Sequence, residues 1–437
     1  MNIVLLSGGS GKRLWPLSND IRSKQFIKIF KDENGCYESM VQRIIRQIKS
    51  VDSEGTITVA TSRAQVSSLH NQLGDIDMSV EPERRETFPA IVLACQYLHE
   101  IKGLSREEII TVCPVDPYVD DSYFSAIKRL GDIISEGLVN IALMGVTPTY
   151  PSEKYGYIIP GDNGEISSVI EYKEKPTLEE AKKYMQDGAL WNAGIFAFKL
   201  GFILDKAHEL IDFEDYADLY DRYSEVPAVS FDVAVVEKEK SLKVVRYTGE
   251  WKDIGTWNTL TEAMDENIIG SGVMDDKCES VHIINEMDMP ILAMGLKDVV
   301  ISASPEGILV SDKENSSYIG PYVEAMDQQV MFADKSWGSM KVLDATSDSM
   351  TIKLIIKPGA SMNYHSHRNR DEVWVVLSGQ GKTVVDGMEQ NIRTSDVITM
   401  SAGCRHTIIA DTELRLIEIQ LGKEISVHDK IKYDMEY

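Results

Sequence analysis

Short apolar runs alternate with amphipathic stretches over the first 262 residues. Strand-like runs rich in β-branched residues stand at 2–6, 57–60, 109–112 and 141–144. Helix-like stretches between them stand at 40–48 and 89–101. This alternation predicts βαβ units, and therefore an α/β domain whose mostly parallel sheet carries helices on both faces.

The pattern changes after residue 262. Brief strands then follow at short intervals, at 291–295, 298–301 and 307–310, with Gly and Asp between them. This spacing predicts a small all-β connector over 263–333.

Longer and more regularly alternating strands follow from residue 334. Turn signals stand at 357–359, 378–379 and 386–387. They predict an all-β barrel or sandwich over 334–437. We therefore expect three domains, 1–262, 263–333 and 334–437, without a low-complexity linker.

Composition narrows the classes of partner and compartment. The 437 residues carry 69 acidic against 45 basic side chains, a net charge of −24, which disfavours binding to nucleic acids or anionic membranes. The five cysteines are scattered without a CxxC pair, as is typical of reduced thiols in a cytoplasmic protein. No signal peptide precedes the first strand, and no apolar run approaches the length of a membrane span.

A glycine-rich loop with fixed positive charge follows the first strand. It reads GGSGKRLWPLS from Gly8, and KQF follows from Lys24. Glycines let backbone N–H groups approach a phosphate, and basic side chains add charge beside it. The loop is no P-loop, because Arg13 follows Lys12, and no dinucleotide fingerprint, because Leu14 replaces the third glycine. We predict a nucleotide site formed by Leu6, Gly8, Gly9, Gly11, Lys12, Arg13 and Lys24.

Two aspartates are candidates for a metal site. Asp116 stands just after the strand at 109–112, and Asp253 lies in the segment WKDIGTW. Either residue alone is more typical of a helix cap or a surface turn. A nucleotide site where phosphates react, however, needs a divalent ion to neutralise their charge, and Mg²⁺ is typically held by one or two carboxylates plus phosphate oxygens.

The glycine loop and several later segments together resemble sugar-1-phosphate nucleotidylyltransferases, and most closely mannose-1-phosphate guanylyltransferases. The later segments are PVD at 114–116, YGYI at 155–158, EKP at 174–176, WNAG at 191–194 and SFD at 230–232. The resemblance implies that Asp116 and Asp253 hold Mg²⁺. It also implies sugar phosphate binding by Gly156, Glu174, Lys175, Asn192 and Asp232, with Arg13, Lys24, Asp116 and Asp253 as catalytic residues.

One segment departs from the family pattern. The family usually has RNTAPAI where this chain reads RETFPAI, with Glu86 and Phe88 at the changed positions. Because that helix start faces the nucleotide base and sugar in the family, another NTP or sugar 1-phosphate stays open.

Three of the eight histidines, His365, His367 and His406, carry a recognisable spacing in the last β-rich segment. The spacing from Gly359 through His365, His367 and Glu372 to Gly379 fits the first cupin motif, and His406 supplies a further ligand. An HxH pair alone is more often incidental, but on a strand its two imidazoles share one face. Three imidazoles and a carboxylate suit Zn²⁺, Mn²⁺, Fe²⁺ or Ni²⁺.

The order of these parts resembles the bifunctional type II mannose-1-phosphate guanylyltransferase/mannose-6-phosphate isomerase proteins. The resemblance implies a Rossmann-like nucleotidyltransferase domain, a left-handed β-helix-like connector and a C-terminal cupin barrel. Two extra residues stand before Glu372 relative to that family, so we expect weak or absent isomerase activity.

The leading hypothesis is a cytoplasmic, homodimeric enzyme for glycan biosynthesis. It would use Mg²⁺ to transfer GMP from GTP to mannose 1-phosphate, giving GDP-mannose and pyrophosphate. The alternatives are the same chemistry on another NTP or sugar 1-phosphate, an added mannose-6-phosphate isomerase activity in the cupin, and a non-catalytic sugar-nucleotide-sensing protein.

Overall fold

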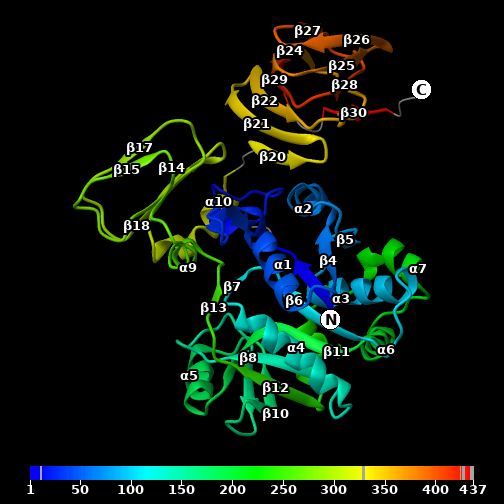
Figure 1. The fold of residues 1–437 in the computed structure, drawn as a ribbon, viewed down its shortest axis with the longest axis vertical. Helices are drawn as coiled ribbons and strands as arrows, with labels where there is room; N and C mark the ends of the chain where they lie inside the picture. Colours follow the sequence, from blue (N-terminus) through cyan, green and yellow to red (C-terminus); the bar gives the residue numbers. More distant parts are fainter. Residues whose placement is uncertain (10–11, 327–329, 424, 426–428, 434–437) are drawn as a thin grey trace. The chain divides into compact units, whose positions relative to one another are not determined.

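The computed structural model describes residues 1–9, 12–326, 330–423, 425 and 429–433 (Figure 1). The chain forms two compact units. The first comprises Met1–Ser10, Lys24–Val66 and Leu73–Asp265, and the second comprises Gly11–Ser23, Ser67–Gln72 and Glu266–Tyr437. The boundaries expected near residues 262 and 333 stay predictions, and Gly11 lies outside the described residues.

A nine-stranded sheet forms the centre of the first unit. Its order is β5 (Asp77–Glu81), β4 (Thr56–Ser62), β1 (Asn2–Ser7), β6 (Ile109–Pro114), β11 (Leu190–Lys199), β8 (Ile141–Val146), β12 (Leu242–Tyr247), β10 (Ile166–Lys173) and β9 (Tyr157–Pro160). The first four strands are parallel, and the order places β1 next to both β4 and β6, as in Rossmann-like folds.

The sheet is mixed rather than mostly parallel. β11 runs antiparallel to both β6 and β8, and β10 runs antiparallel to β9 and β12. The apolar runs carry no signal of strand direction, so the alternation of strands and helices could not reveal this return of the chain.

Helices cover both faces of this sheet. α4 (Ser122–Ser135) packs on β6, β11, β8 and β12, while α3 (Thr87–Gln96) packs on β1, β4 and β5 with α6 (Leu200–Leu210) and α8 (Phe231–Ala234). Residues 88–96 of α3 are all buried, because neighbouring helices cover the side that the sheet leaves open. The first unit also contains α1 (Met40–Val51), α5 (Leu178–Gln186), α7 (Tyr216–Asp221) and α9 (Trp257–Thr261), whereas most of α2 (Val66–Leu73) belongs to the second unit.

Two short pairs of antiparallel strands complete the first unit. β2 (Lys28–Lys31) pairs with β3 (Tyr37–Ser39), and β7 (Pro117–Val119) pairs antiparallel with β13 (Trp251–Asp253). The second pair joins segments more than 130 residues apart in sequence and matters for the site described below.

Parallel rungs of strands build the connector. β14 (Ile268–Gly270), β16 (His282–Asn285) and β18 (Val299–Ser304) pair in parallel, as do β15 (Gly272–Met274) and β17 (Ile291–Ala293). β19 (Gly307–Asp312) turns back along β18, and α10 (Gly320–Glu324) follows. Ile283, Ala293 and Ile301 form a buried core between the rungs, an arrangement typical of a β-helix.

Two antiparallel sheets form the cupin barrel. One has the order β20 (Phe332–Lys335), β21 (Gly338–Ala345), β22 (Ser349–Ile356), β29 (Leu414–Gly422), β24 (Arg370–Ser378) and β27 (Val397–Met400). The other has the order β26 (Met388–Arg393), β25 (Gln380–Val385), β28 (His406–Ala410), β23 (His365–Ser366) and β30 (Ile431–Lys432). Alternate residues of β22 point inward around Trp374, so the period-two pattern of the sequence corresponds to the barrel interior. Among the described residues, no helix is both long and apolar enough to cross a membrane.

Two turn glycines of the barrel give a matched test of its packing. Gly379 and Gly387 both have a positive φ, of 91° and 81°, but a Cβ on Gly379 would lie 2.2 Å from the Glu413 carbonyl oxygen, whereas one on Gly387 would meet nothing within 4 Å. We expect Gly387→Ala to cost about 1 kcal/mol through its backbone alone, and Gly379→Ala about 3 kcal/mol or more. Denaturant unfolding of the full chain would measure both, and equal losses would contradict the predicted clash.

Candidate functional site

Strand pairing brings the two predicted metal carboxylates together. β13 ends at Asp253, which pairs with Pro117, the residue that directly follows Asp116. Both aspartate side chains stay about one-third exposed. The pairing thus places two carboxylates from distant segments at one cleft.

Lys24 supplies the positive charge between these carboxylates. Its Nζ lies 2.8 Å from Asp116 Oδ2 and 3.7 Å from Asp253 Oδ1, and it donates to the Ile254 carbonyl at 3.2 Å. The side chain is only 19% exposed, so the ion pair with Asp116 is partly shielded from water. Two adjacent carboxylates are stabilised by such a cation and would otherwise repel each other.

A cleft of about 220 Å³ opens beside this group. Its described lining joins the aspartates to all five predicted sugar-binding residues. The lining residues are Pro114, Asp116, Pro117, Lys154, Tyr155, Gly156, Glu174, Lys175, Asn192, Ala193, Gly194, Asp232, Trp251 and Asp253.

The sugar side of the cleft carries a hydrogen-bonded polar cluster centred on Tyr172. Asn192 Nδ2 donates to Tyr172 Oη at 2.8 Å and to Asp232 Oδ1 at 2.7 Å. Tyr172 Oη also lies 2.7 Å from Asp232 Oδ1 and 2.9 Å from Glu174 Oε2. One phenol proton cannot serve both carboxyl groups, so the cluster has acceptors to spare for the hydroxyl groups of a ligand.

Burial sets the protonation of this cluster. It raises the pKa of Asp232 to about 6, with a further contribution from the neighbouring charge of Glu174. Burial also raises the pKa of Tyr172 well above its usual value, followed in effect by the charge of Asp232. The tyrosine therefore stays a neutral donor throughout the physiological range.

The absence of a side chain at Gly156 leaves space for the cluster. A Cβ at this position would lie 2.3 Å from Tyr172 Oη and 2.6 Å from Glu174 Oε2, so only glycine fits. Lys175 stands beside it with φ of 45°, and its Nζ lies 3.1 Å from Glu174 Oε1. Its side chain is 60% exposed and is thus accessible to a bound phosphate.

The glycine loop is described in two separate parts. Leu6, Gly8 and Gly9 belong to the first unit, where Gln25 Nε2 donates to the Gly8 carbonyl at 3.2 Å. Gly9 has φ of 94°, and no atom lies within 4 Å of a Cβ placed on Gly8 or Gly9. Lys12 and Arg13 lie on a short 3-10 helix (Lys12–Leu14) that belongs to the second unit, whereas Lys24 and the two aspartates belong to the first.

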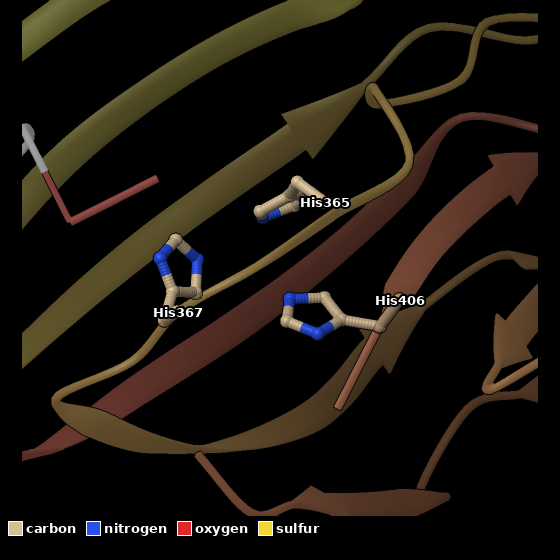
Figure 2. Close-up of side chains that lie close together, drawn as sticks. All are labelled: His365, His367 and His406. Atoms are coloured by element: carbon tan, nitrogen blue, oxygen red, sulfur yellow. The ribbon is translucent and has the colours of Figure 1, made fainter. Parts of the chain in front are cut away.

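The predicted cupin ligands converge inside the barrel (Figure 2). His365 of β23 lies directly opposite His406 of β28, and His367 follows two residues after His365. One ring nitrogen of each histidine lies within 4.8 Å of the others. The Nδ1 atoms face the backbone carbonyls of Asn363, Asp429 and Cys404. Carbonyl acceptors fix the proton on Nδ1 and leave each Nε2 lone pair available to a metal.

Glu372 completes the set of donors. Its Oε1 lies 3.1 Å from His367 Nε2, and its Oε2 lies 3.2 Å from His406 Nε2. Glu372 Oε2 and His406 Nε2 are both buried, and neither has a hydrogen-bond partner among the described residues. Two facing acceptors of this kind fit a bound cation.

Arg370 lies against the same donors. Its Nε donates to Glu372 Oε1 at 3.2 Å, and its Nη2 lies 3.1 Å from His367 Nε2. Arg370 belongs to the lengthened segment before Glu372. Its guanidinium therefore contacts two of the four predicted ligand residues, Glu372 and His367.

A cavity of about 390 Å³ continues from the histidines. Its wall combines apolar and polar residues, and Glu418 and Lys430 are among the polar ones. Burial raises the pKa of Glu418 to about 7 and lowers that of Lys430 to about 8. Burial, together with the charge of Lys430, lowers the pKa of His365 to about 2, which keeps this imidazole in the neutral form that metal binding needs.

Known protein families account for both halves of the chain. Residues 2–268 match the family model described as Nucleotidyl transferase. The chain belongs to the nucleotidyl transferase family. Residues 324–435 match a second family model, Mannose-6-phosphate isomerase C-terminal. The predicted fold class, a nucleotidyltransferase domain followed by a cupin-type domain, is confirmed.

Relatives of this nucleotidyl transferase extend over its whole length. It is 25% identical to the mannose-1-phosphate guanylyltransferase of Salmonella montevideo, with 99% of this chain and 98% of the relative covered. It is 26% identical to the mannose-1-phosphate guanylyltransferase of Escherichia coli (strain K12), with the same coverage. The crystal structure of mannose-1-phosphate geranyltransferase from Thermus thermophilus has a TM-score of 0.62 at 25% identity, covering 75% of this chain and 99% of that chain. The resemblance predicted from the motifs is confirmed.

Several residues of the transferase site escaped the sequence analysis. Tyr172 holds the sugar-side cluster, and Tyr155 Oη donates to Asp253 Oδ2 at 3.4 Å. Tyr172 stands two residues before Glu174, a spacing that puts both on one side of an extended chain and was a usable signal. Arg370, Glu418 and Lys430 of the barrel were also missed. Glu418 and Lys430 reach the cavity through the pairing of β24 with β29 and the chain after it. Arg370 lies within three residues of His367 and Glu372, so its closeness in sequence was a usable signal.

Removing the Tyr172 hydroxyl tests its role as a positioning residue. We expect Tyr172→Phe to raise KM for the sugar phosphate about tenfold, because Asn192 and the two carboxyl groups lose their common partner, while KM for the nucleotide stays within twofold. Steady-state pyrophosphate release would measure both values. Tyr184→Phe, which removes a hydroxyl bonded to exposed Glu171, is the matched control. An unchanged sugar-phosphate KM would contradict the positioning role.

Proposed function

We propose that this chain transfers GMP from GTP to mannose 1-phosphate with the help of Mg²⁺, giving GDP-mannose and pyrophosphate. The observation that carries the proposal is the single cleft in which Asp116 and Asp253 meet the cluster of Asn192, Glu174 and Asp232. The similarity of the whole chain to proteins named mannose-1-phosphate guanylyltransferase supports the choice of GTP and mannose.

The paired carboxylates fit Mg²⁺. Two oxygen ligands at one third exposure leave the remaining coordination positions to water and phosphate oxygens, which is how Mg²⁺ is usually bound. Bound Mg²⁺ would supply neutralisation of the charge that develops on the phosphates. Asp116 and Asp253 would hold it, and Lys24 would add its own positive charge to the triphosphate side.

The sugar side of the cleft suits a phosphorylated polyol. Exposed Lys175 would meet the phosphate of mannose 1-phosphate, while Asn192 and Asp232 would bind ring hydroxyl groups. Because Asp232 and Glu174 are acceptors in a partly buried cluster, a ligand with several hydroxyl donors is favoured over an apolar one.

Transfer would proceed by direct displacement. A phosphate oxygen of mannose 1-phosphate attacks the α-phosphorus of GTP, the bond to the β-phosphate oxygen breaks, and pyrophosphate leaves with that electron pair. The described lining of the cleft contains no Ser, Cys or His to serve as a nucleophile. Alignment of the two substrates and stabilisation of charge would therefore supply the rate enhancement.

The substrates are tested by a pyrophosphate-release screen of four NTPs against a panel of sugar 1-phosphates. We expect GTP with mannose 1-phosphate to give the highest kcat/KM. A preference of more than tenfold for another pair would replace this proposal with the same chemistry on that pair. Glu86 and Phe88, which depart from the family pattern, would then be the first residues to change. The same screen covers the non-catalytic alternative, which predicts no turnover with any pair.

Asp116→Asn and Asp253→Asn test the metal assignment within the same assay. Each should lower turnover by about two orders of magnitude or more at saturating Mg²⁺, since each removes charge from the ion that stabilises the transition state. Asp132→Asn, at an exposed position on α4 outside the cleft lining, is the matched control and should keep normal turnover. Near-normal turnover in both site variants would rule out the assignment.

We also propose a transition metal in the barrel, held by His365, His367, Glu372 and His406. The unpartnered Glu372 Oε2 and His406 Nε2 support it, and a metal that takes His367 Nε2 must displace the Arg370 guanidinium. GDP-mannose would serve glycan biosynthesis, and we propose a homodimeric enzyme acting in the cytoplasm.

Elemental analysis and a coupled isomerase assay test the barrel. We expect about one metal per chain, lost in the double variant His365→Ala/His367→Ala, with guanylyl transfer largely intact because its carboxylates belong to another domain. Arg370→Gln should raise metal affinity, since it removes the competing cation. We expect weak or absent isomerase turnover. A metal-free wild-type protein would remove the ligand assignment, and robust turnover would establish the bifunctional alternative.

A further inference from the structure

The cavity inside the barrel carries an excess of positive charge, although the chain as a whole has a net charge of −24. Lys335, Lys430, Lys432 and Arg370 belong to its described lining, against the single carboxyl group of Glu418. Lys335 ends β20, whereas Lys430 and Lys432 lie at β30, so separate strands bring these charges to one cavity. Like charges at one site are unfavourable unless a counter-charge joins them.

The three lysines lie close enough to influence one another. Burial lowers the pKa of Lys335 and of Lys430, and the charge of Lys432 lowers both further. Among the described residues, none of the three ammonium groups has an ion pair or a hydrogen bond. The carboxyl group of Glu418 instead accepts a hydrogen bond from Gln420 Nε2 at 2.5 Å. Shielded charges without partners favour the binding of an anion.

The strands β21 and β22 give the same cavity an apolar wall. Met340 and Val342 of β21, with Ile352 and Leu354 of β22, belong to its lining. The register pairs Met340 with Leu354 and Val342 with Ile352, so the four side chains form one continuous surface. These side chains offer at most a weak methionine acceptor to a hydroxyl group. A sugar ring placed against them would lose the hydrogen bonds that it makes to water.

We propose that the barrel cavity binds an organic anion with an apolar body. Lys335, Lys430 and Lys432 would hold the charged head group, and the surface formed by β21 and β22 would cover the hydrocarbon body. A cavity of about 390 Å³ is at the small end of the usual range for ligand sites, which suits about ten non-hydrogen atoms. The inference concerns the barrel alone and does not rest on the proposed guanylyl transfer.

Head group and body make separate contributions to this binding. A carboxylate or a phosphate ester would supply the negative charge that the lysines lack within the described part of the chain. Each methylene group that leaves water for the apolar wall strengthens binding about fourfold. A ligand that has only one of the two parts should therefore bind much more weakly than one that has both.

Calorimetric titration of the full chain with four compounds tests both parts. Octanoate has the charged head and the apolar body, acetate has only the head, octanol has only the body, and mannose 6-phosphate has a charged head on a polar body. We expect one octanoate per chain, bound about a hundredfold more tightly than acetate and at least about tenfold more tightly than octanol or mannose 6-phosphate. A smaller preference over any of the three, or no binding of octanoate, would overturn the inference.

Two variants test where the ligand binds. Lys430→Met removes the ammonium group but keeps the length of the side chain, and Met340→Gln places an amide in the apolar wall. Each should weaken octanoate binding about tenfold, and only Lys430→Met should also weaken acetate binding. Lys382→Met is the matched control, since it breaks an exposed ion pair with Glu389 outside the described cavity lining.

Wild-type affinity for octanoate in either Lys430→Met or Met340→Gln would place the ligand elsewhere and overturn the inference. If Lys430→Met does not fold, Lys335→Met makes the same test from another strand, because its ammonium group lies on β20. A loss of octanoate binding in Lys382→Met as large as in the two site variants would likewise contradict the assignment.

Discussion

Two carboxylates at one cleft require a cation, and this requirement governs the transferase half of the chain. The pairing of β7 with β13 brings Asp116 and Asp253 into reach of a single ammonium group, that of Lys24. Electrostatic repulsion between the aspartates is thereby relieved within the protein itself. In the proposed reaction a divalent ion would bind to the same two carboxylates. Lys24 would then be available to the negatively charged triphosphate.

The side of the cleft lined by the predicted sugar-binding residues has more hydrogen-bond acceptors than donors. Asp232 and Glu174 share the single proton of Tyr172, and Gly156 keeps the space that a side chain would fill. A cluster of this kind is held together by its own hydrogen bonds and still has lone pairs for a ligand. Under the proposed function, the end of the cleft near Lys24 and Lys175 would bind phosphate and the end around Asn192 would bind hydroxyl groups.

Polar contacts also hold the segment after the glycine loop against the β connector. Arg22, Asn19 and the turn at 304–307 form a network that is internal to the second unit. The barrel uses backbone carbonyls in a similar way, since they orient His365, His367 and His406 so that Nε2 faces inward. In the barrel, the imidazoles expected to bind a metal are thus oriented by backbone groups that are not themselves ligands.

Local patterns in the sequence determined the elements and the residue types of the sites. The apolar run at 2–6, the glycines at 8 and 9 and the HxH pair are local features, and local sterics and periodicity suffice to interpret them. The family resemblance added Asp116, Asp253 and Asn192 to the predicted site residues. Only the tertiary structure decided that β11 runs antiparallel, that Tyr172 joins two carboxyl groups and that Arg370 meets the cupin ligands. The direction of β11 and the contact of Tyr172 with Asp232 depend on segments tens of residues apart, and strand pairing and packing fix such contacts without leaving a periodic trace in the sequence. Arg370 lies within three residues of His367 and Glu372, but the direction of its side chain is decided by the local fold of the barrel.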